Sequence, residues 1–316
     1  MQKLVLAADL GGTNLRMAAV SRDGDIVFRD KVHTPVSGKR SDILDAIQQM
    51  AEACRSGLAP DQELVAFGAA VPAIVNSRDG IILRSPNLPE LSGLEFAKYF
   101  SDKLSMPVVL ENDANSAGVG ENWKGASRGV QNSICVTLGT GVGGGIIIDG
   151  KLLRGVDGTA GEIGHIAVEP NGHPCGCGSV GCVEQYSSAT AIKRIVRELL
   201  PKYPDSLLSG ETDISPLKVY EAGVKGDALS LEIFRIFGTY LGIALGGLVN
   251  VLNPEAIVLG GGVSAGWDLF IDPLRDEIFR RAFQHPAERV RLMRSELGDD
   301  AGIVGAAFLA SGSVFD

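Results

Sequence analysis

The chain has 316 residues, about twice the usual size of one domain, so its length favours two domains. Hydrophobic residues make up 45% and charged residues 21%, a composition that excludes a disordered or fibrous protein. The net charge of −9 argues against a broad surface for nucleic acid or an anionic membrane, so small ligands are expected. The 41 glycines indicate many tight turns and close backbone approaches.

The first half of the chain reads as strands and helices in alternation. Asp-Gly at 23–24 supplies the positive φ of a hairpin turn between the second and third strands. Asp42 can cap the first helix, and Gly57 closes it. The predicted strands are residues 3–9, 15–20, 26–32, 64–71 and 107–111, and the predicted helices are 41–57 and a segment near 93–104.

The second half begins in the same way. A strand at 133–138, a glycine loop at 139–145, a strand at 146–148 and an Asp-Gly turn at 149–150 lead into a further strand at 151–153. The order strand, glycine loop, strand, Asp-Gly turn, strand therefore occurs twice, which indicates an internal duplication of a phosphate-binding unit.

A third glycine turn, Gly260–Gly262, follows a predicted strand at 256–259, and helices are expected near 187–200 and 228–252. Ligands of open α/β sheets bind beyond the carboxyl ends of the strands, so three such turns suggest one nucleotide held between two domains.

The apolar stretch 236–254 contains glycines, two asparagines and a proline, which favours a buried helix over a membrane span. No signal peptide is indicated, because the first apolar run meets Asp9 before it reaches the required length. The odd number of five cysteines does not suit a disulfide framework, so we expect a reducing, cytoplasmic location.

Two glycine loops are candidates for phosphate binding. Asp9-Leu10-Gly11-Gly12-Thr13-Asn14 places a carboxylate beside bare backbone N–H groups, as metal-bound phosphate requires; alone, it could equally be a hairpin turn with a capping Asp. The loop from Gly139 to Gly144 matches the dinucleotide fingerprint, with Glu162 at a suitable distance. We reject that fingerprint, because it requires a helix where residues 146–150 have strand and turn chemistry.

The segment Glu111-Asn112-Asp113-Ala114-Asn115 follows a strand and carries two carboxylates and two amides. A surface turn would have the same composition. Alternatively, the amide of Asn112 fixes a substrate hydroxyl while the carboxylate of Asp113 takes its proton.

One histidine and three cysteines form the most specific pattern in the sequence. His165, Cys175, Cys177 and Cys182 supply the four ligands of a closed tetrahedral zinc site, and the intervening glycines let the backbone wrap around the ion. The alternative is a set of buried free thiols, which requires neither the histidine nor the glycines. Cys54 and Cys135 lie in apolar periodic segments and are expected in the core.

These motifs together resemble the ROK sugar kinases, and the resemblance covers essentially the whole chain. It implies an α/β, two-domain actin/hexokinase-like ATPase fold of duplicated ribonuclease H-like domains with an interdomain cleft. The smaller domain would comprise residues 1–115, completed by a C-terminal helix at about 301–316, and the larger one residues 116–300. Asp9 to Asn14 resembles the first phosphate loop, Leu138 to Gly145 the second, and Leu259 to Ser264 the adenosine motif.

The resemblance also implies the role of each candidate residue. Asp113 would be the general base, and a sugar would be held by Asn112, Asp113, Glu162, His165 and Glu184. ATP with Mg²⁺ would be bound by Asp9, Gly11, Gly12, Thr13, Asn14, Gly139, Thr140, Gly141, Gly261 and Gly262. A structural Zn²⁺ would lie on His165, Cys175, Cys177 and Cys182, so that one imidazole nitrogen binds the metal while the other faces the sugar.

The sequence departs from the family pattern at Pro72-Ala73, where Pro-Gly is usual, and after Asn87-Leu88, where a Trp is missing. Because both positions lie near the sugar in relatives, they bear on which sugar is preferred. The expected activity is ATP-dependent phosphorylation of a hexose at the 6-hydroxyl, with glucose the first choice and N-acetylmannosamine, N-acetylglucosamine or fructose as alternatives. A homodimer is expected by resemblance.

A sugar-responsive transcriptional regulator is the non-enzyme alternative. Such proteins carry an N-terminal helix-turn-helix module, whereas Asp9 already belongs to the first phosphate loop. The acidic charge balance also disfavours DNA as a partner.

Overall fold

The structure, a computed structural model, describes residues 1–312 and 314. The chain forms two compact units. Unit 1 contains Met1–Gln131, Gly145–Gly161 and the residues from Glu296 onward, and unit 2 contains Asn132–Gly144 and Glu162–Ser295. Unit 1 therefore takes in more of the middle of the chain than the smaller domain expected from the sequence.

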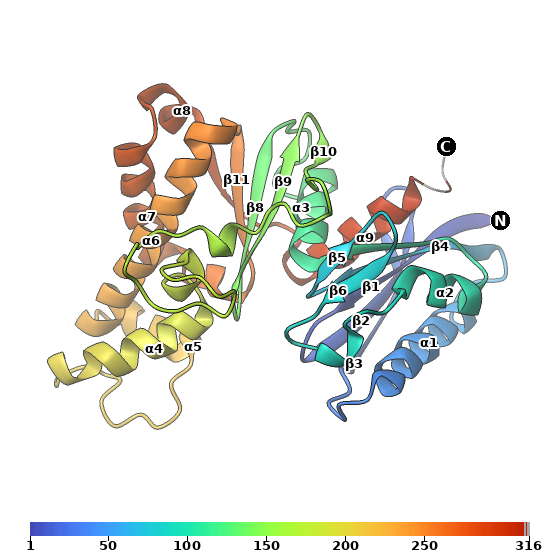
Figure 1. Cartoon of the computed structure of the whole chain (residues 1–316), viewed down its shortest axis with the longest axis horizontal. Coiled ribbons are helices and arrows are strands. Elements are labelled where there is room, and N and C mark those ends of the chain that lie inside the picture. Colours follow the sequence, from blue (N-terminus) through green and yellow to red (C-terminus); the bar gives the residue numbers. More distant parts are fainter. Residues whose placement is uncertain (313, 315–316) are drawn as a thin grey trace. The chain divides into compact units, whose positions relative to one another are not determined.

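Unit 1 is built on a five-stranded sheet, visible among the blue and teal strands of Figure 1. Its order is β3-β2-β1-β4-β7; β1, β2 and β3 pair antiparallel, whereas β4 and β7 run parallel to β1. The strands are β1 Gln2–Leu10, β2 Asn14–Ser21, β3 Ile26–His33, β4 Gln62–Val71 and β7 Val108–Asn112. A separate hairpin consists of β5 Ile74–Asn76 and β6 Ile81–Arg84.

Helices cover both faces of this sheet because each face of β1 is apolar. Leu4 and Leu6 pack with α1 and α2, whereas Val5 and Ala7 point to the other face, against α9. This alternation follows from the two-residue period of a strand. The helices of the unit are α1 Arg40–Ser56, η1 Pro89–Leu91, α2 Phe96–Leu104, α3 Asp113–Trp123, η6 Gly298–Asp300 and α9 Ala301–Ser311.

The second five-stranded sheet has the order β10-β9-β8-β11-β12. Its strands are β8 Ser133–Leu138, β9 Val142–Ile148, β10 Lys151–Leu152, β11 Ala256–Gly260 and β12 Arg291–Arg294. Each sheet thus places its third, second, first, fourth and fifth strands side by side in that order, and β11 runs parallel to both β8 and β12. The repeated strand order confirms the internal duplication predicted from the two glycine loops.

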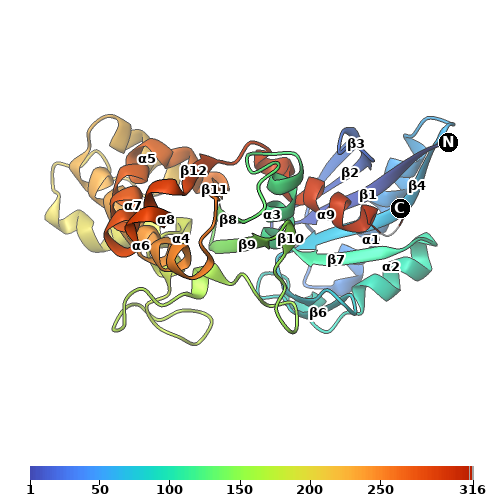
Figure 2. The same ribbon diagram turned by 90° about the horizontal axis from the view of Figure 1, so that it is seen from above.

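The helices of unit 2 pack around a long apolar helix, α6, which Figure 2 shows beside α7. They are η2 Ile163–His165, η3 Val183–Gln185, α4 Ala189–Leu199, η4 Leu200–Lys202, α5 Pro216–Val224, α6 Ala228–Leu252, η5 Gly262–Gly266, α7 Trp267–Arg281 and α8 Gln284–Arg289. Among the described residues, α6 is the one helix long and apolar enough to cross a membrane.

The glycines of α6 allow this apolar helix to pack closely on α7. A Cβ at Gly238 would meet the backbone oxygen of Phe270 in α7, and one at Gly242 would lie 2.6 Å from the oxygen of Leu274. Glycine at every fourth position thus lets the two helices approach closely. The helix expected at 228–252 is confirmed, with the core role that the sequence favoured.

Several predicted details need correction. β9 begins at Val142, so Gly143, Gly144 and Gly145 lie in a strand, not in a loop. Asp42 lies in the first turn of α1, but the residue at the cap position is Lys39, which makes no side-chain capping bond. The C-terminal helix is expected at about 301–316, whereas α9 begins at Ala301 and ends at Ser311. Residues 313, 315 and 316 lie outside the described residues.

Candidate functional site

The first glycine turn, between β1 and β2, is closed by its own backbone. The N–H of Gly11 donates to the oxygen of Asn14 at 2.8 Å. Thr34, which follows β3, donates its hydroxyl to the oxygen of Gly11 at 2.7 Å, and its own N–H to the oxygen of Thr13 at 3.0 Å. The turn is therefore held by the three antiparallel strands of its own sheet.

Asp9 stands at the end of β1 before this turn. Its Oδ2 accepts from Arg16 Nη1 on β2 at 3.1 Å, while Nη2 of the same arginine binds Asp299 at 2.7 Å. Burial raises the pKa of Asp9, and the Arg16 guanidinium only partly offsets this effect. A buried carboxylate at a strand end is suited to a divalent cation, whose charge would compensate the lost solvation.

The segment that joins β7 to α3 is organised by Asn112. Its side-chain oxygen accepts from the N–H of Ala114 at 2.9 Å and of Asn115 at 3.1 Å, so that it caps α3. Its Nδ2 donates to the oxygen of Ala73 at 3.2 Å. Asn112 therefore has a structural task beside the sugar contact implied by resemblance, and Ala73, where the family pattern has Gly, receives that bond through its backbone.

Asp113 is the first residue of α3 and is half-buried. Its Oδ1 accepts from the N–H of Ala114 at 2.8 Å. The N-terminus of a helix favours negative charge, and the bond from Ala114 fixes the direction of the carboxylate. Both properties suit a base that receives a proton from a bound hydroxyl.

Glu111 precedes these residues and is almost fully buried, with 1% of its surface exposed. Its carboxylate accepts from Arg154 Nε at 2.8 Å and from Ser77 Oγ and Asn115 Nδ2, each at 3.1 Å. No sequence motif indicates this role for Glu111, since the arginine lies 43 residues away in the chain. The ion pair between Glu111 and Arg154 anchors the start of the Asn112–Asp113 segment.

The second glycine turn, between β8 and β9, receives hydrogen bonds from the start of α4. The N–H of Gly139 donates to the oxygen of Gly141 at 3.0 Å, two residues on, whereas the bond that closes the first turn spans three residues. The N–H of Ala189 donates to the oxygen of Gly139 at 2.9 Å, and Thr190 Oγ1 donates to that of Thr140 at 2.8 Å. No sequence motif indicates this support, because it comes from residues 50 positions downstream.

The third turn follows β11. Gly261 has a φ of 83°, and a Cβ there would lie 2.5 Å from the backbone oxygen of Leu138 at the end of β8. Ser264 Oγ donates to the oxygen of Gly261 at 2.7 Å. Only glycine fits position 261. Because this position lies against the end of β8, the second and third glycine turns lie side by side in unit 2.

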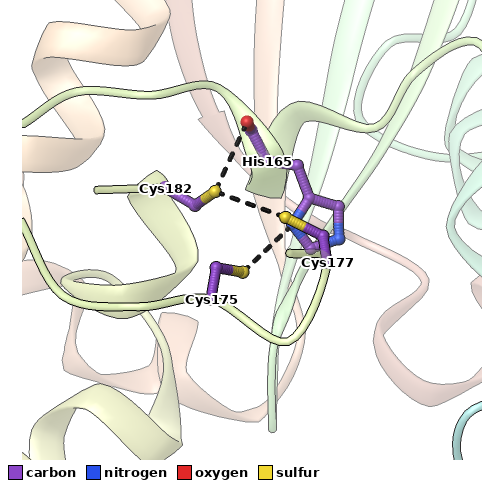
Figure 3. A group of neighbouring side chains, drawn as sticks. All are labelled: His165, Cys175, Cys177 and Cys182. Carbon is purple, nitrogen blue, oxygen red and sulfur yellow. Dashed lines mark hydrogen bonds between the residues drawn. The ribbon is translucent and has the colours of Figure 1, made fainter. Parts of the chain in front are cut away.

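His165, Cys175, Cys177 and Cys182 converge on one point in unit 2, as Figure 3 shows. Their ligand atoms all lie within 4.8 Å of one another; His165 Nδ1 is 3.5 Å from Cys175 Sγ, and the sulfurs of Cys177 and Cys182 are 3.7 Å apart. Tetrahedral zinc requires about 3.6 Å between a nitrogen and a sulfur ligand and about 3.8 Å between two sulfurs. The cluster is therefore compatible with a structural zinc.

The surroundings of Cys177 and Cys182 shift the pKa values of their thiols in opposite directions. Burial raises the pKa of Cys182 to about 12, whereas a hydrogen bond from the backbone of Ser179 lowers the pKa of Cys177. Zinc binds thiolates, so loading the site would release protons. Among the described residues the five cysteines form no disulfide, and Cys54 and Cys135 are buried as predicted.

Two carboxylates flank the histidine. Glu162 Oε2 is 3.9 Å from His165 Nε2, the nitrogen that faces away from the cysteines. Burial raises the pKa of Glu162; His165 opposes this effect, and the charge of Glu184 adds to it. Glu184 itself accepts at 3.0 Å from the N–H of Val142, the first residue of β9, directly after the second glycine turn.

The predicted residues thus form two groups, one in each unit. Unit 1 holds Asp9, the first glycine turn, Asn112 and Asp113, and unit 2 holds the second and third glycine turns, Glu162, Glu184 and the four cluster residues. The three glycine turns, Asp9 and the Asn112–Asp113 segment lie at the ends of sheet strands or immediately after them, as expected for an α/β ligand site. Glu162, Glu184 and the four cluster residues lie instead in the segment between β10 and α4.

Comparison with known proteins agrees with this architecture. The model of the ROK family matches residues 5–313. A glucokinase of Thermotoga maritima is 36% identical over 312 residues, which cover 97% of each chain. A ROK family glucokinase from Streptomyces griseus, solved in complex with glucose and AMPPNP, has a TM-score of 0.81 and 36% identity over 98% of this chain and 99% of that one.

Regulators share the fold as well. A ROK family transcriptional regulator, described as a homologue of the E. coli MLC protein, gives a TM-score of 0.90 at 27% identity, and the match covers 98% of this chain but 78% of the regulator. The fold and the paired sheets define an actin/hexokinase-like ATPase architecture. The chain belongs to the ROK family.

Proposed function

We propose that this protein transfers the γ-phosphoryl group of ATP to the 6-hydroxyl of glucose. The chain is a sugar kinase, in keeping with the glucokinases that it matches from end to end. Glucose as the preferred sugar is supported by those relatives, one of which was solved with glucose and AMPPNP.

The arrangement around His165 carries the proposal. One imidazole nitrogen of His165 faces three cysteine sulfurs, and the other faces the carboxylate of Glu162. Glu184 is close enough to raise the pKa of Glu162. A metal on Nδ1 would fix the tautomer, so that Nε2 keeps its hydrogen and donates. A fixed donor between two acceptor carboxylates suits the neighbouring hydroxyls of a sugar ring.

In the proposed reaction, Asp113 accepts the proton of the 6-hydroxyl while the oxygen attacks the γ-phosphorus. The bond from that phosphorus to the β,γ-bridging oxygen breaks, and ADP leaves with the electron pair. Such a transfer depends on alignment and charge neutralisation more than on covalent help from the protein. Asn112, by capping α3, would hold the base in direction and offer its second amide hydrogen to the sugar.

The glycine turns would bind the nucleotide through backbone N–H groups, as in other phosphate sites. Asp9 is the residue proposed to hold Mg²⁺, which neutralises phosphate charge when it is bound. Zn²⁺ on the four-residue cluster would be structural, because the protein supplies all four ligands and leaves no open position. The predicted cytoplasmic location and the homodimer stay predictions.

A coupled assay of ADP release tests the proposal, with glucose, mannose, fructose, N-acetylglucosamine and N-acetylmannosamine as acceptors. We expect the highest kcat/KM with glucose. A higher value with another hexose would change the substrate and keep the kinase. Sugar binding without ADP release from any acceptor would overturn the proposed reaction and favour a sugar-responsive regulator.

A further inference from the structure

Glu184 makes a contact that a purely sugar-binding carboxylate would not need. Its Oε2 accepts a hydrogen bond of 3.0 Å from the backbone N–H of Val142, which lies 42 residues earlier and is the first residue of β9, directly after the second glycine turn. A carboxylate that accepts from a backbone N–H makes one of the stronger hydrogen bonds available in a protein. The same side chain can still accept bonds from hydroxyls, because a carboxylate has about four acceptor positions.

The turn is shaped around this carboxylate. A Cβ at Gly141 would collide with Glu184 Oε2, and the nearest other atoms it would meet are Cδ and Cγ of the same side chain. Gly141 has no positive φ that would itself require glycine. Glycine therefore suits position 141 because the Glu184 carboxylate occupies the space that a Cβ would need.

A second segment of the proposed sugar site packs on the same turn. A Cβ at Gly164, next to His165, would collide with the backbone oxygen of Val142. The N–H of Val142 thus meets Glu184, and its carbonyl abuts the Glu162–His165 segment. The carbonyls of Gly139 and Thr140 are held by the start of α4, five and six residues beyond Glu184.

From these contacts we infer that Glu184 is a positioning residue for the nucleotide-binding turn, in addition to its proposed contact with the sugar. This inference rests on the proposed function. It implies that the second glycine turn takes its phosphate-binding shape only while the Glu184 carboxylate holds the N–H of Val142. The first glycine turn, which Thr34 and its own strands hold, has no such dependence.

The inference can be tested because the hydrogen bond made by Glu184 and the negative charge of Glu184 should have opposite effects on nucleotide affinity. A negative side chain near a phosphate-binding turn repels the nucleotide, so removal of charge alone should tighten binding. Loss of the hydrogen bond should weaken binding, because the turn must then be ordered by the nucleotide itself. Glu184→Gln removes the charge and keeps an acceptor oxygen, whereas Glu184→Ala removes both.

The measurement is the Kd of AMPPNP with Mg²⁺, without sugar, by isothermal titration calorimetry on the full chain. We expect Glu184→Ala to weaken binding about tenfold, the effect of one hydrogen bond to a charged group, and Glu184→Gln to stay within about twofold of wild type or to tighten. Glu162→Ala is the matched comparison: among the described residues, the Glu162 carboxylate lies 3.9 Å from His165 Nε2 and makes no hydrogen bond to the second glycine turn, so its loss should affect sugar affinity and leave the AMPPNP Kd within about twofold.

Gly141→Ala tests the same contact from the opposite side. Its methyl group must displace the Glu184 carboxylate, so we expect the same weakening as for Glu184→Ala. The double variant should be no weaker than Glu184→Ala alone, because the two changes break one contact. Additive losses would contradict this. Gly141→Ala also keeps the carboxylate, so the contact is tested even if Glu184→Ala does not fold; zinc content and the melting temperature report folding.

The outcomes separate the inference from the proposed function. If Glu184→Ala and Glu184→Gln both bind AMPPNP as wild type does, or both bind it more tightly, the carboxylate does not position the turn and the inference fails, while the kinase proposal stands. If the wild-type protein binds no AMPPNP and releases no ADP with any hexose, both fail together.

Discussion

The two glycine turns of the repeated sheet motif are each closed by a backbone hydrogen bond from their first glycine, to Asn14 in the first turn and to Gly141 in the second, but they have different supports. In the first, the oxygen of Gly11 is held by Thr34 from the adjoining strand, and the nearby carboxylate Asp9 is paired with Arg16 on the next strand. In the second, the supports are Glu184 and the first residues of α4. A duplicated strand order therefore preserves the turn, while the second copy has acquired supports from residues more than 40 positions away.

The difference between the two turns indicates that the two units contribute differently to the proposed function. Unit 1 offers a turn that its own strands hold and a proposed base at the start of α3. Unit 2 offers a turn that depends on a segment organised around the histidine–cysteine cluster. We therefore expect metal loss and variants of the cluster to affect the second turn, and variants of unit 1 to affect proton transfer or local stability.

The largest effect is expected from the loss of Cys177, one of the four proposed zinc ligands. This residue is exposed, so Cys177→Ser changes little packing, and its consequences report the metal. Structural zinc contributes about 10 kcal/mol or more in peptide sites, and we expect roughly half of that in a larger unit. The variant should lose zinc, as measured by inductively coupled plasma mass spectrometry, and its unfolding free energy should fall by several kcal/mol.

Cys54→Ala is the matched control, because it removes a buried thiol from the core of unit 1. It should cost about 1–2 kcal/mol through packing and leave the zinc content unchanged. Hydrogen exchange should localise the loss in Cys177→Ser to residues 162–184. Active wild-type protein that contains no zinc would refute the metal assignment.

Asp113→Asn is expected to have the next largest effect. The amide keeps the size of the side chain and an acceptor for the Ala114 N–H, but it cannot take the proton of a hydroxyl. We expect kcat to fall at least about 100-fold, the low end for loss of a positioned base, with a much smaller change in sugar affinity. Steady-state kinetics and sugar titrations measure the two quantities separately.

Glu162→Gln sharpens this test, because it alters the proposed sugar site in unit 2 and leaves the base intact. Its effect should appear mainly in KM. Near-normal turnover of Asp113→Asn, or an equal loss of kcat in both variants, would contradict the division of roles between the units.

Local patterns predicted much of the fold. The bounds of α6 and β8 agree with the sequence, because long apolar periods and flanking turn residues define them. The Asp-Gly turn at 149–150 has φ values of 50° and 71°, the positive pair that the dipeptide predicts. These features depend on a few adjacent residues, so they can be read without knowledge of the packing.

The elements that the sequence missed are stabilised by distant contacts. The helix α3 contains two glycines and polar residues that disfavour helix on propensity; a Cβ at Gly120 would collide with the backbone oxygen of Ala301, so the helix is built to pack closely on α9. Gly145 likewise lies in β9 although glycine weakens a strand, because a Cβ there would be 2.8 Å from the oxygen of Ala114.

The candidate site shows the same division. The four cluster residues could be found from ligand type and spacing, and the structure brings them together. Neither the hydrogen bond from Val142 to Glu184 nor the ion pair between Glu111 and Arg154 could be found, because each joins segments about 40 residues apart with no shared motif. The Asn112 cap was open to prediction, since Asn before a helix is a common capping residue.

A smaller effect is expected at the two hairpin turns. Gly24 has a φ of 85° and Gly150 a φ of 71°, a backbone conformation that costs other residues about 1–2 kcal/mol. A Cβ at Gly24 would also lie 2.9 Å from the ring of Trp123, whereas one at Gly150 would meet only the flexible end of Gln131 at 3.1 Å. We expect Gly24→Ala to cost about 2–3 kcal/mol and Gly150→Ala about 1 kcal/mol.

Urea unfolding measures both costs. Equal destabilisation would mean that the Trp123 ring moves aside freely, and that the first hairpin is no more tightly packed than the second.

The smallest effect concerns the stability of Asp9 against pH. Because burial raises its pKa in the folded protein, the ionised form is less stable there than in the unfolded chain. Its favourable contribution is complete below the ordinary pKa of 3.8 and is lost as the pH rises through the folded value. Asn cannot ionise, so the stability of Asp9→Asn relative to wild type should rise over this range and then become constant.

Thermal unfolding from pH 3 to pH 7 measures this difference, and Asp299→Asn is its control. Both aspartates pair with Arg16, but the Asp299 side chain is 84% exposed and that of Asp9 17%, so Asp299→Asn should show little pH-dependent gain. If Asp9→Asn were less stable than wild type at pH 7, the ion pair with Arg16 would outweigh the cost of burial. The first glycine turn would then resemble the second in depending on a carboxylate for its stability, and the contrast between the two turns would be lost.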